Sequence, residues 1–102
     1  MKDKILVIGS SNIDLILRIP HFHHPGETIK GENLVTVFGG KGANQAIASK
    51  RLGGKVTFMT KLGNDSYGKS YHHYLIKMGL QQKYLLKDKM LPTGIALIEL
   101  VP

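Results

Sequence analysis

The stretch FGGKGANQA at residues 38–46 places three glycines, one lysine and one asparagine in nine positions. Gly40 has no Cβ, so the backbone there can approach another group closely. Lys41 donates hydrogen bonds and carries positive charge, and the amide of Asn44 both donates and accepts. The stretch is therefore typical either of a tight structural turn or of backbone that closely approaches a small polar ligand.

A second polar segment, GSSNID at residues 9–14, follows the apolar run of residues 5–8. Asn12 can donate and accept hydrogen bonds, and the carboxylate of Asp14 can accept several at once. Taken singly, Asp14 could also cap a turn, since Asp is a common turn residue. The segment thus leaves a turn and a ligand site as alternatives.

The two common nucleotide-binding motifs do not explain residues 38–46. A phosphate-binding P-loop, GxxxxGK[ST], would need a glycine at Val35 and a serine or threonine at Gly42. A dinucleotide-binding GxGxxG pattern counted from Gly40 would need its third glycine at Gln45. Neither nucleotide motif therefore explains this stretch.

The elements that must position these residues follow from hydrophobic patterning. The continuous apolar run of residues 5–8 predicts a strand buried on both faces, as in a parallel sheet. Small and aliphatic residues over 41–52 predict a helix, and a turn at 63–66 with an N-cap candidate precedes a second helix that Gly79 ends. Further strands are expected at residues 13–19, 35–37, 55–62, 82–86 and 94–101.

This alternation predicts an α/β fold with a mostly parallel sheet. Ligands of such sheets bind outside the carboxyl ends of the strands. Residues 9–14 follow a predicted strand, and residues 39–44 open a predicted helix, whose first backbone N–H groups are unpaired. We expect both segments to face one crevice.

Composition sets broad limits on the other function classes. The chain has 102 residues, no cysteine and a net charge of +7. The absence of cysteine excludes disulfides and Cys-ligated metals, and the run at residues 5–8 is too short for a signal peptide or a membrane span. An intracellular (cytoplasmic), soluble chain without membrane partners is expected. The lysines are scattered, the tightest group being Lys83, Lys87 and Lys89, so we do not expect nucleic-acid binding.

The five histidines do not predict a metal site. His21, His23 and His24 precede a Pro-Gly turn, and His72 and His73 are neighbours on a predicted helix, where adjacent side chains face different directions.

Taken together, the motifs resemble the ribokinase-like (PfkB) carbohydrate kinases. GGKGANQA at residues 39–46, followed by Gly53 and Gly63, is similar to the first signature of that family. The resemblance to members that phosphorylate ribose is stronger still, and it continues through GSSNID at 9–14, PGET at 25–28, GNDSYG at 63–68 and TGIALI at 93–98.

The resemblance implies a three-layer α/β/α fold with a small β-sheet lid, of which this chain would be the N-terminal part. Residues 1–15 and 39–92 would belong to the α/β kinase domain, and residues 16–38 and 93–102 to the lid. Lids of two subunits would pair in a homodimer. A lid sheet with Val35, Val37, Ile95 and Leu97 would otherwise show an apolar face.

The resemblance also implies ATP-dependent phosphorylation of D-ribose at O5. It assigns sugar contacts to six matching positions: Asn12, Asp14, Gly40, Lys41, Asn44 and Ala96. A pentose presents several vicinal hydroxyls, which suit a carboxylate and two amides beside exposed backbone.

The family's catalytic aspartate, nucleotide pocket and monovalent-cation site lie in a later part of a longer chain. We therefore expect no catalytic, ATP-binding or metal-binding residue here, and we expect ATP, Mg²⁺ and a monovalent cation such as K⁺ to bind mainly outside it. Residues 94–102 end in an apolar run without a closing turn, which also suggests a fragment that would be inactive alone. Two alternatives remain open: a kinase for another sugar or a nucleoside, such as fructose or adenosine, and a non-catalytic lid or dimerisation module.

Overall fold

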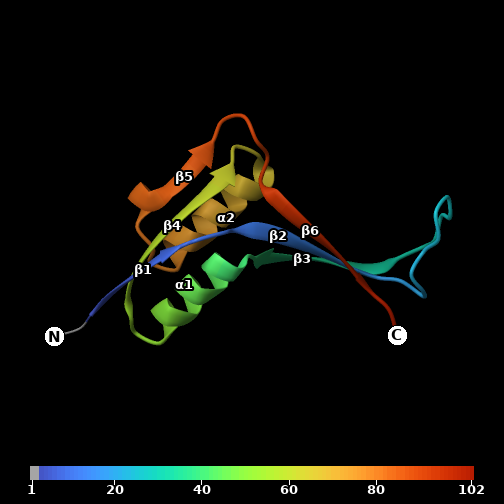
Figure 1. Ribbon diagram of the computed structural model, residues 1–102, viewed down its shortest axis with the longest axis horizontal. Helices are drawn as coiled ribbons and strands as arrows, with labels where there is room; N and C mark the ends of the chain where they lie inside the picture. Colours follow the sequence, from blue (N-terminus) through green and yellow to red (C-terminus); the bar gives the residue numbers. More distant parts are fainter. Residues whose placement is uncertain (1–2) are drawn as a thin grey trace.

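The structure is a computed structural model that describes residues 3–102. Its helices and strands follow one another in the order β1 (Lys4–Ile8), β2 (Asn12–Arg18), β3 (Glu32–Gly39), α1 (Lys41–Arg51), β4 (Lys55–Gly63), α2 (Ser66–Lys77), η1 (Gln82–Tyr84), β5 (Leu85–Asp88) and β6 (Gly94–Leu100). The strands form two sheets, ordered β1-β4-β5 and β3-β2-β6. Figure 1 shows the second sheet extending away from the two helices, which gives an elongated molecule of 56 × 32 × 19 Å.

The first sheet is parallel throughout, which confirms the predicted α/β class. β1 pairs with the first half of β4, from Lys4 opposite Lys55 to Ile8 opposite Met59. β5 pairs only with the second half of β4, beginning with Thr60 opposite Leu85. The first half of β4 is therefore without a neighbouring strand on the β5 side, among the residues described.

Both helices pack on the same face of this parallel sheet. Phe58 and Leu62 of β4 point into a buried cluster with Ile47 of α1 and with Tyr71 and Leu75 of α2. Burying one such large side chain stabilises the fold by about 1.5–3 kcal/mol. Residues 3–102 thus supply two layers of the three-layer arrangement.

The prediction that β1 is buried on both faces is wrong for this chain. Only Val7 packs against the core, while Leu6 is 59% and Ile8 69% exposed. Leu6 and Ile8 lie on the face opposite the helices, since they pair with Thr57 and Met59 of β4. A continuous apolar run is typical of a strand that is covered on both faces. Within residues 3–102, however, the helices cover only one face of β1.

The second sheet, which we call the lid sheet, consists of β3, β2 and β6. β2 runs antiparallel to β3 and parallel to β6. β2 is continuous from Asn12 to Arg18, so the domain boundary expected after residue 15 falls inside a strand. Met1 and Lys2, the first residues of the expected kinase segment, lie outside the described residues. The division into kinase domain and lid stays a prediction.

The four residues expected to share one apolar lid face are divided between its two faces. Val35 and Val37 pair with Ile16 and Asp14, whereas Ile95 and Leu97 pair with Ile13 and Leu15. Side chains alternate between the faces of a strand, so these two pairs point in opposite directions. All four are at least 40% exposed, and both faces of the lid sheet are therefore partly apolar.

The boundaries of the remaining elements are close to those predicted. α1 ends at Arg51, one residue early, and Asp65 is the N-cap of α2. The strand expected at residues 82–86 is wrong at its start, because residues 82–84 form the 3₁₀ turn η1 and β5 begins only at Leu85. Within residues 3–102 no helix combines the length and the apolar character needed to cross a membrane.

Candidate functional site

Asn12 and Asp14 lie at the start of β2, two residues apart and therefore on the same face of the lid sheet. The Asn12 Nδ2 group donates a hydrogen bond of 2.9 Å to Asp14 Oδ1. This bond orients both side chains and leaves Asp14 Oδ2 free to accept from a ligand. Both residues are partly exposed, so a ligand can reach them.

The carboxylate of Asp14 lies against the backbone of Gly39, the last residue of β3. A Cβ atom on Gly39 would be 2.5 Å from Asp14 Oδ2 and 2.7 Å from Asp14 Cγ. No side chain larger than hydrogen fits there unless the carboxylate moves. Gly39 therefore determines where the Asp14 carboxylate can lie.

A second close contact joins the start of α1 to the loop after β1. Gly9 and Gly42 pack backbone to backbone, and a Cβ on Gly42 would lie 2.7 Å from Gly9 Cα. The Ala43 N–H donates to the Ser10 carbonyl over 2.9 Å. Gly40, with φ of 107°, would place a Cβ only 2.6 Å from the Ser10 oxygen. The glycines thus bring the two polar segments together, and the expectation that both face one crevice stays a prediction.

The N-terminus of α1 has one of its N–H groups, that of Ala43, bonded to the Ser10 carbonyl. No side chain caps it, and no acidic residue lies in its first turn. Lys41 and Asn44 are exposed and three residues apart, so they share one side of the helix. The helix dipole and Lys41 together favour negative or electron-rich groups at this position.

Ala96 of β6 lies beside Asp14, its register partner in the lid sheet. It is partly exposed on the same face. The structure therefore groups Asn12, Asp14 and Ala96 on the lid sheet and places Gly40, Lys41 and Asn44 at the start of α1. Asn12, which pairs with Gly39, links the two groups. Their roles as sugar contacts stay predictions.

Sequence reasoning missed the contribution of Tyr71, which it treated as part of the helix core. The Tyr71 side chain is fully buried, and its hydroxyl donates a 2.7 Å hydrogen bond to the Gly39 carbonyl. Burial, followed by the nearby Tyr74, raises the pKa of Tyr71 to about 12. The Tyr71 ring stacks on Phe38 with 4.5 Å between the ring centroids. The signal available in the sequence was the hydroxyl itself, since a buried tyrosine usually needs a hydrogen-bond partner.

Asp65 connects the start of α2 to the start of the lid strand β6. Its Oδ1 accepts from the Thr93 hydroxyl at 2.6 Å and from the Gly68 N–H at 2.8 Å, and its Oδ2 accepts from the Thr93 N–H at 2.8 Å. The hydrogen bonds from Thr93 are the main reason that the pKa of Asp65 lies below its usual value. Asp65 therefore acts both as a helix cap and as an anchor for β6.

Two of the histidines before the Pro-Gly turn contact glutamate carboxylates. His21 Nε2 lies 3.2 Å from Glu27, and His23 Nδ1 lies 3.1 Å from Glu99 of β6. Nowhere in residues 3–102 do three His, Asp or Glu side chains group in a way that could hold a metal ion.

Comparison with known proteins identifies the family of this chain. The family described as "pfkB family carbohydrate kinase" matches residues 2–102. The ribokinase of Haemophilus influenzae is 39% identical over 99 residues, which is 97% of this chain and 32% of that protein. The chain thus spans about a third of the length of the curated relative.

Solved structures agree with the sequence comparison. The ribokinase of Thermotoga maritima superimposes with a TM-score of 0.85 at 40% identity, covering 95% of this chain and 32% of that one. The ribokinase of Arabidopsis thaliana, solved with ribose and ATP, gives 0.87 at 34% identity, covering 99% and 33%. The family match over residues 2–102, together with the identity and fold shared with these proteins, shows that this chain belongs to the pfkB family of carbohydrate kinases.

Proposed function

We propose that the complete protein containing this chain transfers the γ-phosphoryl group of ATP to O5 of D-ribose. Residues 3–102 supply one part of the sugar site, made of Asn12, Asp14, Gly40, Lys41, Asn44 and Ala96. The identity to ribokinases over nearly the whole chain supports this proposal. The supporting observation from the structure is the position of Asp14.

Asp14 is a carboxylate held in place without a positive partner. Within residues 3–102 no lysine, arginine or histidine forms an ion pair with it. Asn12 and Gly39 fix its position, and hydrogen bonds to a charged group are worth about 1.5–3 kcal/mol. A pair of sugar hydroxyls is a suitable partner, because each can donate to one carboxylate oxygen.

Lys41 and the start of α1 suit the other side of the sugar. Lys41 and the N-terminal end of the helix dipole are both positive, so they favour the negative charge that gathers during phosphoryl transfer. Asn44 can donate to and accept from one hydroxyl. Gly40 leaves its backbone accessible to the ring.

We assign no contact with ATP, Mg²⁺ or a monovalent cation to the described residues. They contain no metal-ligating cluster, and neither nucleotide motif fits the glycine-rich stretch. Binding of ATP, Mg²⁺ and K⁺, and the catalytic base, are proposed for the rest of the protein. Because the reaction consumes ATP, we propose the cytoplasm as its location.

We further propose that two copies pair through their lid sheets. The face that carries Asp14 continues along the strands with Ile16, Val35, Ile98 and Leu100. Val35, Ile98 and Leu100 are between 38% and 47% exposed. A second lid against this face would bury these side chains and would also cover the end of the sheet where Asp14 lies.

The test is an assay of the complete purified protein for ATP-dependent phosphorylation of ribose, fructose and adenosine, with calorimetric titration of each. Ribose as the preferred substrate supports the proposal. Preference for fructose or adenosine makes the protein a different kinase of the same family. Binding of none of the three favours the non-catalytic module.

A further inference from the structure

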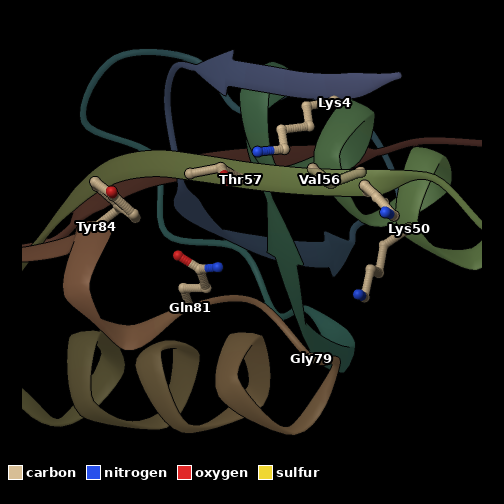
Figure 2. Close-up of a pocket in the computed structure, with 8 residues that line it drawn as sticks. Lys4, Lys50, Val56, Thr57, Gly79, Gln81 and Tyr84 are labelled. Atoms are coloured by element: carbon tan, nitrogen blue, oxygen red, sulfur yellow. The ribbon is translucent and has the colours of Figure 1, made fainter. Parts of the chain in front are cut away.

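A cavity of about 450 Å³ lies at the opposite end of the parallel sheet from Asp14. It is lined by Lys4, Lys50, Lys55, Val56, Thr57, Gly79, Gln81 and Tyr84. The cavity opens between the first half of β4, which has no neighbouring strand on that side, and the segment that links α2 to β5 (Figure 2). β1 has five residues and rises about 3.3 Å for each, so its length places this end of the sheet roughly 16 Å from the segment that follows β1.

Three lysines and no acidic residue line this cavity. Lys4 and Lys55 are register partners on adjacent strands, so their side chains leave the same face of the sheet. Like charges at such positions repel each other unless a counter-charge is present. Within residues 3–102, none of the three lysines forms an ion pair.

The end of the Lys50 side chain lies beside Gly79. A Cβ on Gly79 would lie 3.0 Å from Lys50 Cε and 3.6 Å from its Nζ, so the end of the lysine rests on the bare Gly79 backbone. Gly79 has φ of 94°, which also disfavours any other residue there. Figure 2 shows the Lys50 amine and the Gln81 amide in the space between β4 and the segment around Gly79, whereas the Lys4 amine lies between β1 and β4.

The helix ends account for only part of this charge. Lys50 lies in the last turn of α1 and beside the segment that follows α2, where carbonyl groups attract a cation. Lys4 and Lys55 come from strands and have no such partner. Lys83, whose Nζ lies 5.5 Å from the centre of the Tyr84 ring, adds a fourth positive charge beside the lining. Among the described residues, no carboxylate pairs with the lysines of this cavity.

We propose that this cavity binds a compact, multiply charged phosphate anion, at a site separate from the sugar site. Lysine is a common point-charge ligand for phosphate. Gln81, Thr57 and Tyr84 add neutral donors. The volume falls in the range of small-molecule sites, so a diphosphate or a phosphorylated sugar can enter.

The probe for the test is inorganic diphosphate, added to the complete protein. Lysine acetylation followed by mass spectrometry reports each amine separately. Diphosphate should slow the acetylation of Lys4, Lys50 and Lys55 by about fivefold or more while leaving Lys69 and Lys77 of α2 unchanged, since a bound anion shields only the amines that it contacts. Sodium chloride at equal ionic strength controls for screening.

Two double variants test whether diphosphate binds in this cavity or at another phosphate site in the protein. The affinity for diphosphate is measured from the concentration that protects Lys50 from acetylation. The double variant Lys4→Gln/Lys55→Gln should lower this affinity by about tenfold or more. The matched double variant Lys69→Gln/Lys77→Gln removes the same charge from α2 and should leave the affinity unchanged. Equal protection by chloride, or equal affinity in both double variants, would overturn the proposal. Because the readout is local to the cavity, it does not depend on whether the protein phosphorylates ribose.

Discussion

The Asp14 carboxylate occupies the space that a side chain on Gly39 would need. A Cβ on Gly39 would lie 2.5 Å from Asp14 Oδ2, so a glycine on β3 determines the position of a charged group on β2. This relationship links the glycine-rich stretch to the polar segment after β1.

Gly39→Ala should weaken ribose binding by displacing the Asp14 carboxylate. We expect the KM for ribose to rise about tenfold or more, which corresponds to about 1.4 kcal/mol of binding free energy. The fold should be retained, because Gly39 does not adopt a positive φ. Gly94→Ala is the matched control, since Gly94 pairs with Asn12 from the other side and its Cβ would make only an ordinary 3.4 Å contact. Equal KM values for the two variants would contradict this account.

Gly40→Ala should destabilise the protein more than Gly53→Ala does. Both residues have positive φ, 107° and 91°, so both variants incur backbone strain of about 1 kcal/mol or more. Only Gly40 would also bring a Cβ within 2.6 Å of a backbone oxygen, whereas Gly53 has open space around it. Denaturant unfolding of the two variants measures the difference. Equal losses in the free energy of unfolding would show that the backbone around Ser10 moves away from the added Cβ of Gly40→Ala at no cost.

Tyr71→Phe should affect both stability and sugar binding. It removes the hydrogen bond to the Gly39 carbonyl but keeps the ring stacked on Phe38. We expect a loss of about 1–2 kcal/mol in the free energy of unfolding, since the carbonyl is left without its buried donor. We also expect a several-fold rise in the KM for ribose at nearly constant kcat.

Tyr74→Phe is the control for that variant. The Tyr74 hydroxyl only accepts a 3.3 Å hydrogen bond from Arg51 at the exposed surface, so both quantities should change little. If Tyr71→Phe lowered stability and left KM unchanged, Tyr71 would serve the core alone. In a difference titration by ultraviolet absorbance, the wild type should show a tyrosine ionisation at about pH 12 that Tyr71→Phe lacks.

The sequence predicted the elements of this fold well because each one carries its own local signal. The N-cap at Asp65 and the glycines that follow both helices are examples. It also placed Asn12, Asp14 and Gly40 near one another. It failed for the exposure of Leu6 and Ile8 and for the division of Val35 and Ile95 between two faces. Those features depend on which elements cover a sheet and on strand register. Neither can be predicted from a short stretch of sequence.

Asp65 should make the stability of the protein depend on pH in the acid range. The pKa of Asp65 is lowered in the folded state. Its contribution to stability is therefore complete above the pKa of an unperturbed aspartate, about 3.9, and is lost as the pH falls through the lower pKa of the folded state. We expect the melting temperatures of wild type and Asp65→Asn to differ at pH 7 and to converge as the pH drops below about 4.

Asp3→Asn provides the control for that comparison, because Asp3 is exposed and makes no ion pair among the described residues. It should follow the wild-type curve throughout. A gap between wild type and Asp65→Asn that stays constant down to about pH 2 would argue against the role assigned to the Thr93 hydrogen bonds.

The most direct test of the proposed sugar site is the affinity of the complete protein for ribose after Asp14→Ala. We predict that isothermal titration will show a Kd raised by about 10- to 100-fold, as expected for the loss of hydrogen bonds to a charged group, while Asp3→Asn binds like the wild type. An unchanged ribose Kd in a folded Asp14→Ala protein would contradict the assignment of this carboxylate to the sugar.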